Sequence, residues 1–179
     1  MEKRIIVAGF GGQGVLLIGQ LIAYAGMLAG KEVSWMPSYG PEMRGGSANC
    51  AVVVSDEPVA SPKVEEADVV VAMNRPSMEL FEKTLLPGGI LLYNSSLIDR
   101  QPARKDIRAV AVPCNEIAGD LGFARGTNMV MLGAYAGITG AFSIDVLMDA
   151  LYHKLGPAKE RFMPANRQAI EAGMAAAKG

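Results

Sequence analysis

The sequence predicts an α/β fold: a Rossmann-like three-layer α/β/α sandwich with a mostly parallel sheet and at least one antiparallel pair. Short apolar, β-prone runs alternate with helical segments along most of the chain. The first run ends in glycines and continues directly as an apolar helix, as in nucleotide-binding folds. Two further runs are joined by a connection too short for a helical crossover. Because the chain has 179 residues, 50% of them hydrophobic, we expect a single domain spanning residues 1–179.

A glycine-rich turn follows the first strand. Its residues are Gly9, Phe10, Gly11, Gly12, Gln13 and Gly14. The spacing fits G-x-G-x-x-G, in which glycines let the backbone approach a pyrophosphate and the anion sits at a helix N-terminus. The dinucleotide pattern also needs an acidic residue about 20 positions further on, at the end of the second strand. That strand, Glu32 to Met36, ends without one. We therefore expect no useful binding of NAD or NADP, and a turn that serves helix–strand packing or another anion.

The first helix, Val15 to Ala29, carries apolar residues around its whole circumference. Because hardly any polar face is left to meet water, we expect it to be buried on every side. Its cover is either its own domain or, in part, another subunit. It is not a membrane span, since it is shorter than about 20 residues and carries Gly19, Gln20 and Tyr24.

A second loop, dense in turn-forming residues, follows the second strand. It comprises Ser38, Tyr39, Gly40, Pro41, Glu42, Met43, Arg44, Gly45 and Gly46. Loops at the carboxyl end of a strand are where α/β folds bind ligands. Tyr39 offers an aromatic face, and the planar five-donor group of Arg44 suits a carboxylate or a phosphate. The alternative is that Glu42 and Arg44 pair with each other and brace the loop.

A strand from Ala48 to Val54 comes next with no helix before it, so it should pair antiparallel within a mixed sheet. We then expect strands at Asp68–Met73, Gly89–Asn94 and Ile107–Val112. A helix at Ser77–Leu85 lies between the first two, and the following Pro-Gly-Gly is expected to end it.

The chain is expected to be helical from Asn115 onward. Thr127 and Ser143 are placed to cap the N-termini of two helices. The segment from Met129 to Thr139 is rich in glycine and alanine, so it should pack closely against another element. A last helix is expected to start near Pro164.

Charge and cysteine content exclude several classes of function. The net charge of −1 and the pI near 5.9 offer nothing that would recruit nucleic acid or an anionic membrane. Cys50 and Cys114 lie far apart, which argues against a zinc site, an iron–sulfur cluster or a disulfide framework and indicates the cytoplasm. His153 has no acidic or hydroxyl partner at helical spacing, so we expect no catalytic and no metal-binding residue in this chain. A basic cluster interrupted by Asp106 is expected to be a solvated loop; its members are Arg100, Arg104, Lys105 and Arg108.

Several of these segments together resemble the gamma subunit of the 2-oxoacid:ferredoxin oxidoreductases, the group that includes the pyruvate and 2-oxoglutarate enzymes. The resemblance rests on the turn at residues 9–14, the loop at residues 38–46, Ala67-Asp68, Ala72-Met73-Asn74, Asn128 and Leu132-Gly133. It implies one α/β domain of a multi-subunit enzyme that oxidatively decarboxylates a 2-oxoacid. Coenzyme A would be the acyl acceptor and ferredoxin the electron acceptor.

The resemblance also implies where the cofactors lie. Thiamine diphosphate and the iron–sulfur clusters would sit on alpha, beta and ferredoxin-like delta subunits, so the isolated chain would bind no cofactor and be inactive. A gamma subunit without an attached cluster domain most resembles the 2-oxoglutarate type, with pyruvate and branched-chain acids as alternatives. Arg44 would help to hold coenzyme A or the subunit interface, and the turn at residues 11–14 is the second candidate for binding the anion.

A further expectation concerns the chain on its own. Surfaces that should meet partner subunits would be uncovered, so the isolated chain is expected to self-associate, most simply as a homodimer.

The competing function is that of a Rossmann-like nucleotide-binding regulatory or structural protein, which would account for the fold but not for the second loop.

Overall fold

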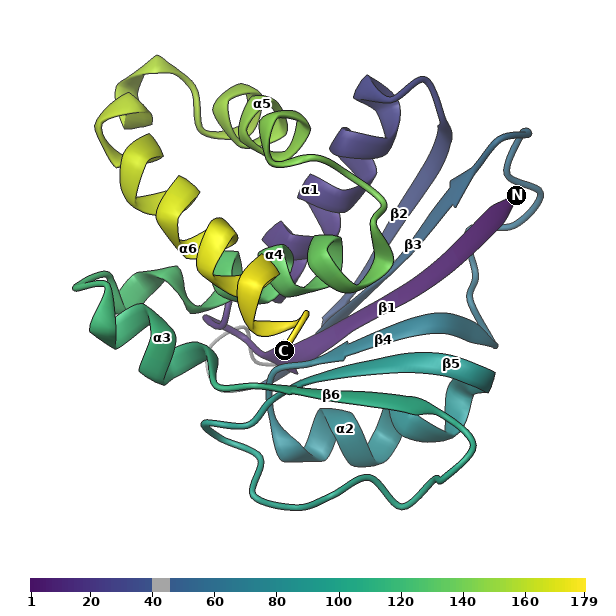
Figure 1. Cartoon of the computed structure of the whole chain (residues 1–179). Helices are drawn as coiled ribbons and strands as arrows, with labels where there is room; N and C mark the ends of the chain where they lie inside the picture. Colours follow the sequence, from purple (N-terminus) through teal and green to yellow (C-terminus); the bar gives the residue numbers. More distant parts are fainter. Residues whose placement is uncertain (40–45) are drawn as a thin grey trace.

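The computed structural model describes residues 1–39 and 46–179 and is built around a six-stranded mixed sheet (Figure 1). The strands are β1 (Glu2–Phe10), β2 (Glu32–Tyr39), β3 (Ser47–Ser55), β4 (Ala67–Ala72), β5 (Leu85–Asn94) and β6 (Arg108–Val112), in the order β2-β3-β1-β4-β5-β6. β3 is antiparallel to both of its neighbours, whereas β1, β4, β5 and β6 pair in parallel. The predicted mixed sheet is confirmed, and β3 supplies the antiparallel pairs.

Helices cover the two faces of the sheet unequally (Figure 1). They are α1 (Val15–Leu28), α2 (Arg75–Phe81), α3 (Cys114–Asp120), α4 (Thr127–Thr139), α5 (Ile144–Leu155) and α6 (Met163–Ala176), with 3₁₀ turns at Glu82–Thr84, Ala124–Gly126 and Pro157–Phe162. α2 lies on one face, and the other helices lie on the opposite face, where the larger core forms. The predicted three layers are therefore present, with most of the apolar core in one of the two interfaces.

α1 is buried along most of its length. Ile18, Leu21 and Ile22 are fully buried, and α1 packs against β2, β3, α4 and α5. Its last turn is open, because Met27 and Leu28 are 57% and 45% exposed. The chain itself thus supplies most of the cover that the sequence predicted. No described helix has both the length and the hydropathy needed to span a bilayer.

α4 and α6 are in direct backbone contact. A Cβ atom at Gly133 would lie 1.9 Å from the carbonyl oxygen of Ile170, and one at Gly173 would lie 1.8 Å from that of Val130. Both distances are far below van der Waals contact, so only glycine permits this approach. The predicted close packing of the glycine- and alanine-rich segment is confirmed.

Two helix boundaries differ from those predicted. α2 begins at Arg75, because the Asn74 side chain accepts a hydrogen bond from the amide of Ser77 at 2.9 Å and caps the helix. The Pro87-Gly88-Gly89 segment does not end that helix. It lies inside β5, where the register against β4 shifts and Gly88 adopts a φ of 76°. Proline and glycine mark a strand irregularity as readily as a helix end.

The two predicted N-caps have different outcomes. Ser143 caps α5 by accepting a hydrogen bond from the amide of Val146 at 3.3 Å, as predicted. Thr127 is instead the first residue of α4, and Gly126 occupies the cap position. The preceding 3₁₀ turn already carries the chain into helical geometry, so no side-chain cap is used there.

Candidate functional site

The carboxyl ends of the parallel strands meet at one edge of the sheet, and the glycine-rich turn lies there. The amide of Gly11 donates to the carbonyl oxygen of Gly46 at 2.8 Å, and Phe10 pairs with Ser47 at the end of the β1–β3 ladder. The turn and the end of the second loop are therefore in contact. The backbone of Tyr39 closes the β2–β3 ladder, whereas Arg44 and the rest of residues 40–45 lie outside the described part of the chain.

The side chain of Gln13 ties this turn to β4. Its Oε1 accepts from the amide of Phe10 at 2.7 Å and from Nδ2 of Asn74 at 3.3 Å. Its Nε2 donates to the carbonyl oxygen of Met73 at 3.2 Å. The carboxamide thus makes three hydrogen bonds inside the protein, so Gln13 fixes the shape of the turn.

The glycines of the turn have separate roles. A Cβ at Gly9, still within β1, would lie 2.8 Å from Cγ1 of Val15 and 2.6 Å from Oε1 of Gln13. Gly9 therefore allows strand and helix to approach. Gly12 and Gly14 have φ values of 95° and 74°, in the left-handed region that favours glycine. Gly12 is exposed, so the backbone is open to an approaching ligand there.

α1 begins without a side-chain cap. Gly14 stands at the N-cap position and makes no side-chain hydrogen bond, so the first N–H groups, at the positive end of the helix dipole, have no side-chain cap. Asn128, at the start of α4, lies directly over Gly14: a Cβ there would be 2.4 Å from its Nδ2. This arrangement is suited to an anion that approaches from solvent.

Asn74 and Asn128 shape this site, although the sequence indicated them only as part of the family resemblance. For Asn74 a local signal exists, because asparagine two positions before a proline and three before a serine is typical of a helix N-terminus. For Asn128 no local signal exists, since its position over Gly14 depends on how α4 packs beside α1.

The sheet order gives a further reason to expect no dinucleotide binding. In the dinucleotide fold the second strand lies beside the first and brings its terminal acid to the ribose. Here β3 separates β1 from β2, so the end of β2 is displaced to about 10 Å from β1, twice the usual strand spacing. Met36 also lies within β2 rather than at its end.

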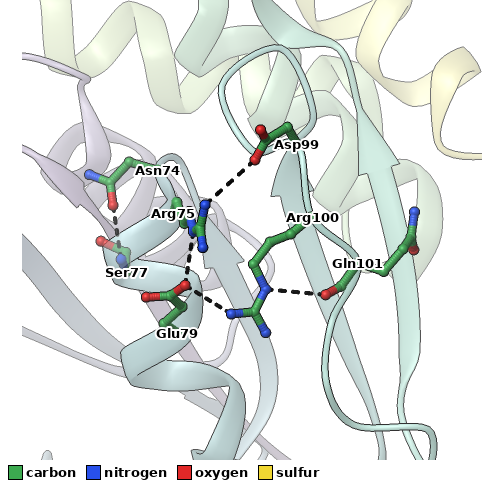
Figure 2. A network of polar contacts seen from close by, with 7 residues as sticks. All are labelled: Asn74, Arg75, Ser77, Glu79, Asp99, Arg100 and Gln101. Carbon is green, nitrogen blue, oxygen red and sulfur yellow. Dashed lines mark hydrogen bonds and ion pairs between the residues drawn. The ribbon is translucent and has the colours of Figure 1, made fainter.

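Part of the predicted basic cluster lies in a network of ion pairs near the start of α2 (Figure 2). Glu79 accepts from Arg75 at 2.9 Å and from Arg100 at 2.8 Å, and Asp99 lies 3.8 Å from Arg75. The two arginines lower the pKa of Glu79. Arg104 hydrogen-bonds to the carbonyl of Leu85 and pairs with Asp106, so the expectation of a merely solvated loop is wrong for it. The carboxylates of this network are exposed, whereas the Leu85 carbonyl that holds Arg104 belongs to a buried residue.

The two cysteines lie in the core. Cys50 and Cys114 are fully buried, and burial raises the pKa of both thiols to about 12. The described residues contain no group of three or more side chains that could hold a metal ion. His153 is exposed, and the centroid of its ring lies 5.7 Å from that of Tyr24. Among the described residues its side chain has no hydrogen-bonded acid or base.

This burial predicts slow alkylation. In the folded chain at pH 8, iodoacetamide should modify neither Cys50 nor Cys114 at an appreciable rate, because a thiol with a pKa of about 12 is almost wholly protonated. Both should react promptly in denaturant. Mass spectrometry of alkylated protein measures this, and rapid labelling of the native chain would contradict it.

A second prediction concerns the turn. Gln13→Leu should lower the free energy of unfolding by about 2 kcal/mol, because it leaves the buried Met73 carbonyl and Asn74 amide without their partner. Gln20→Leu, on α1 but without a side-chain hydrogen bond to the described residues, should change it by less than about 0.5 kcal/mol. Urea denaturation compares the two, and equal effects would show that the carboxamide contacts contribute little.

Fold and site together describe an α/β domain with an uncapped helix N-terminus at the carboxyl edge of its sheet, and comparison with known proteins identifies the family. Residues 4–176 match the family model of pyruvate ferredoxin/flavodoxin oxidoreductase, and the chain belongs to this family. Over 96% of its length it is 42% identical to ketoisovalerate oxidoreductase subunit VorA of Methanothermobacter thermautotrophicus. The match covers 36% of VorA, so the chain spans about a third of that relative. It is also 33% identical to 2-oxoglutarate synthase subunit KorC of Methanothermobacter marburgensis, over 97% of the chain and 95% of KorC.

Solved structures confirm the fold and the gamma type. The gamma subunit of keto/oxoacid ferredoxin oxidoreductase from Geobacter sulfurreducens superposes with a TM-score of 0.83 at 30% identity, covering 98% of both chains. A chain of 2-oxoglutarate:ferredoxin oxidoreductase from Magnetococcus marinus, solved with 2-oxoglutarate, coenzyme A and succinyl-CoA, gives a TM-score of 0.89 at 30% identity. It is matched over 99% of this chain and 31% of its own length. The sequence-based recognition of a gamma-type chain is thereby confirmed.

Proposed function

We propose that the chain acts as the gamma subunit of a 2-oxoacid:ferredoxin oxidoreductase that converts a 2-oxoacid to its acyl-CoA. The observation that carries this proposal is the end-to-end match to separate subunits of about the same length, KorC and the Geobacter gamma subunit. The KorC match favours 2-oxoglutarate as the substrate. The higher identity to VorA favours a branched-chain 2-oxoacid as the second candidate. In either role residues 1–179 form one gamma-type domain.

Within that enzyme, the carboxyl edge of the sheet would bind the anionic part of coenzyme A. The open N-terminus of α1, the exposed Gly12 and the adjoining second loop support this role. A phosphate there would accept hydrogen bonds from backbone amides and meet the positive end of the helix dipole. The candidate residues remain Gly9, Gly11, Gly12, Gln13, Gly14, Tyr39 and Arg44. Gln13 would act indirectly, because its side chain is already bonded to the protein.

The remaining chemistry would be supplied by other subunits. We assign thiamine diphosphate and the iron–sulfur clusters to alpha, beta and ferredoxin-like delta subunits in the cytoplasm, with ferredoxin reduced through the complex. A four-iron cluster takes four cysteine thiolates, whereas this chain has two cysteines, both buried as thiols. Free of its partners, the chain would be inactive and would form a homodimer.

The test is anaerobic purification of an affinity-tagged chain from its native host, followed by identification of the proteins and cofactors that accompany it. We expect subunits that carry thiamine diphosphate and iron–sulfur clusters, and a preparation that reduces ferredoxin with one class of 2-oxoacid. A panel of 2-oxoglutarate, 3-methyl-2-oxobutanoate and pyruvate identifies that class. Recovery of the chain free of such subunits would overturn the proposal.

A further inference from the structure

A cavity lies at the opposite edge of the sheet from the candidate site. It has a volume of about 470 Å³ and is lined by the first residues of β1, β4 and β5 and by the last turns of α4. Figure 1 shows where these elements begin and end. Val69 and Ile90 of the sheet form one side, and Tyr135 and Ile138 of α4 form the other. Cavities of this size hold small organic molecules in many proteins. This one is mostly apolar, with a few polar groups.

Tyr135 gives the cavity a buried hydroxyl group. The residue is 3% exposed, and the side chain of Thr139 lies within hydrogen-bond reach of its phenol group. The nearby Thr139 hydroxyl is largely occupied, since it donates to the carbonyl oxygen of Tyr135 at 2.6 Å and accepts from the amide of Ala141 at 3.3 Å. A phenol hydroxyl can both donate and accept, so beside Thr139 it can still make one hydrogen bond to a polar group within the cavity.

Lys3 and Asp68 bring charges of opposite sign to the same cavity. Nζ of Lys3 lies 3.5 Å from Oδ1 of Asp68, and the other oxygen of Asp68 accepts from the amide of Arg4 at 2.8 Å. The Lys3–Asp68 contact is long, which leaves donors on the ammonium group unused. A ligand with a net charge would be opposed by one member of the pair, whereas a ligand with both charges is complementary to both.

The irregular part of β5 shapes the wall of the cavity. Residues 86–89 bulge from the ladder, and a Cβ at Gly89 would lie 2.8 Å from the carbonyl oxygen of Leu86 and 3.1 Å from that of Asp68. The bulge is tied to the chain beyond it by the amide of Gly88, which donates to the carbonyl of Asp106 at 2.7 Å. Bulges of this kind recur beside functional sites, where they re-aim side chains.

We propose that this cavity binds an apolar α-amino acid in its zwitterionic form. The carboxylate pairs with Lys3, the ammonium group with Asp68, and the apolar side chain packs on Val69, Ile90 and Ile138. The hydroxyl of Tyr135 supplies one further hydrogen bond. The cavity has room for branched and aromatic side chains. This binding does not depend on the function proposed above, because it uses the other edge of the sheet.

Isothermal titration calorimetry of the unaltered chain with L-valine, L-leucine and L-phenylalanine tests the proposal. At least one should bind more tightly than about 1 mM. Two half-ligands of the amino acid that binds, each lacking one of the two charged groups, serve as controls. For L-leucine they are 4-methylpentanoate, which lacks the ammonium group, and 3-methylbutylamine, which lacks the carboxylate. For L-valine or L-phenylalanine the carboxylic acid and the amine with the same side chain are used. Each half-ligand should bind about 10–100-fold more weakly, because one charge-assisted contact is lost. Absence of binding by all three amino acids, or a half-ligand that binds as tightly, overturns the proposal.

A conservative variant locates the binding. Tyr135→Phe keeps the buried ring and removes the hydroxyl, so the affinity for the amino acid should fall by about 5–10-fold. Tyr152→Phe, at an exposed tyrosine on α5, is the matched control and should leave the affinity unchanged. Equal affinities for all three proteins would show that the amino acid binds elsewhere and would contradict the proposal. The half-ligand comparison decides the ligand class without any variant.

Discussion

Gly173→Ala is expected to lower the free energy of unfolding by about 3 kcal/mol, the upper end of the range for overpacking. The added methyl group would lie 1.8 Å from the carbonyl oxygen of Val130 and 2.7 Å from its carbonyl carbon. Both atoms belong to the backbone of α4, so no side-chain rotation can relieve the clash. The two helices would have to separate, which opens a large part of the core on that face of the sheet.

Gly119→Ala is the matched control for this substitution. Gly119 lies in α3 without a positive φ, and a Cβ there would meet no atom within 4 Å. Alanine should therefore stabilise the protein slightly, by up to about 1 kcal/mol, because it restricts the unfolded chain. Urea denaturation followed by circular dichroism compares both variants with the parent. A Gly173→Ala protein as stable as the parent would show that α4 and α6 are not in backbone contact.

Arg44→Ala is expected to raise the apparent Michaelis constant for coenzyme A, or to weaken subunit assembly, by about 10–100-fold in the complete enzyme. The loss of one charge-assisted contact, about 1.5–3 kcal/mol, corresponds to this factor. Arg44 lies outside the described residues, but the loop that carries it ends at Gly46, which accepts from Gly11 of the glycine-rich turn. A ligand that occupies one segment would therefore lie close to the other.

Arg44→Lys separates a planar donor from a simple positive charge. Lysine should restore little of the lost affinity, because an ammonium group cannot make two parallel hydrogen bonds to a carboxylate or phosphate. Steady-state kinetics with coenzyme A and the 2-oxoacid as varied substrates measure both variants. An Arg44→Ala enzyme that assembles normally and keeps the parent kinetics would show that the loop is structural.

Local sequence patterns were sufficient for features that depend on neighbouring residues. The turn at residues 9–14, the buried helix after it and the close packing of the segment around Gly133 each follow from composition and spacing within one stretch. The antiparallel course of β3 followed from the length of a single connection. Each of these inferences needed no knowledge of which distant segments are in contact.

The missed features depend on distant contacts. β3 lies between β1 and β2 in the sheet. The short connection between β2 and β3 predicts that these two strands pair, but it does not predict which of them lies next to β1. Asn128 reaches Gly14 only because α4 packs beside α1. The Pro-Gly-Gly segment was misassigned because the same residues suit a helix end and a strand bulge, and the pairing of β4 with β5 decides between them.

We expect this chain to be a necessary subunit of a 2-oxoacid:ferredoxin oxidoreductase. The most direct measurement is reconstitution: the partner subunits are produced without this chain, and 2-oxoacid-dependent reduction of ferredoxin is followed anaerobically as the chain is added. We expect negligible acyl-CoA formation without the chain and a rate that rises to saturation as it is added. Full activity of the partner subunits alone, with no response to the added chain, would contradict the claim.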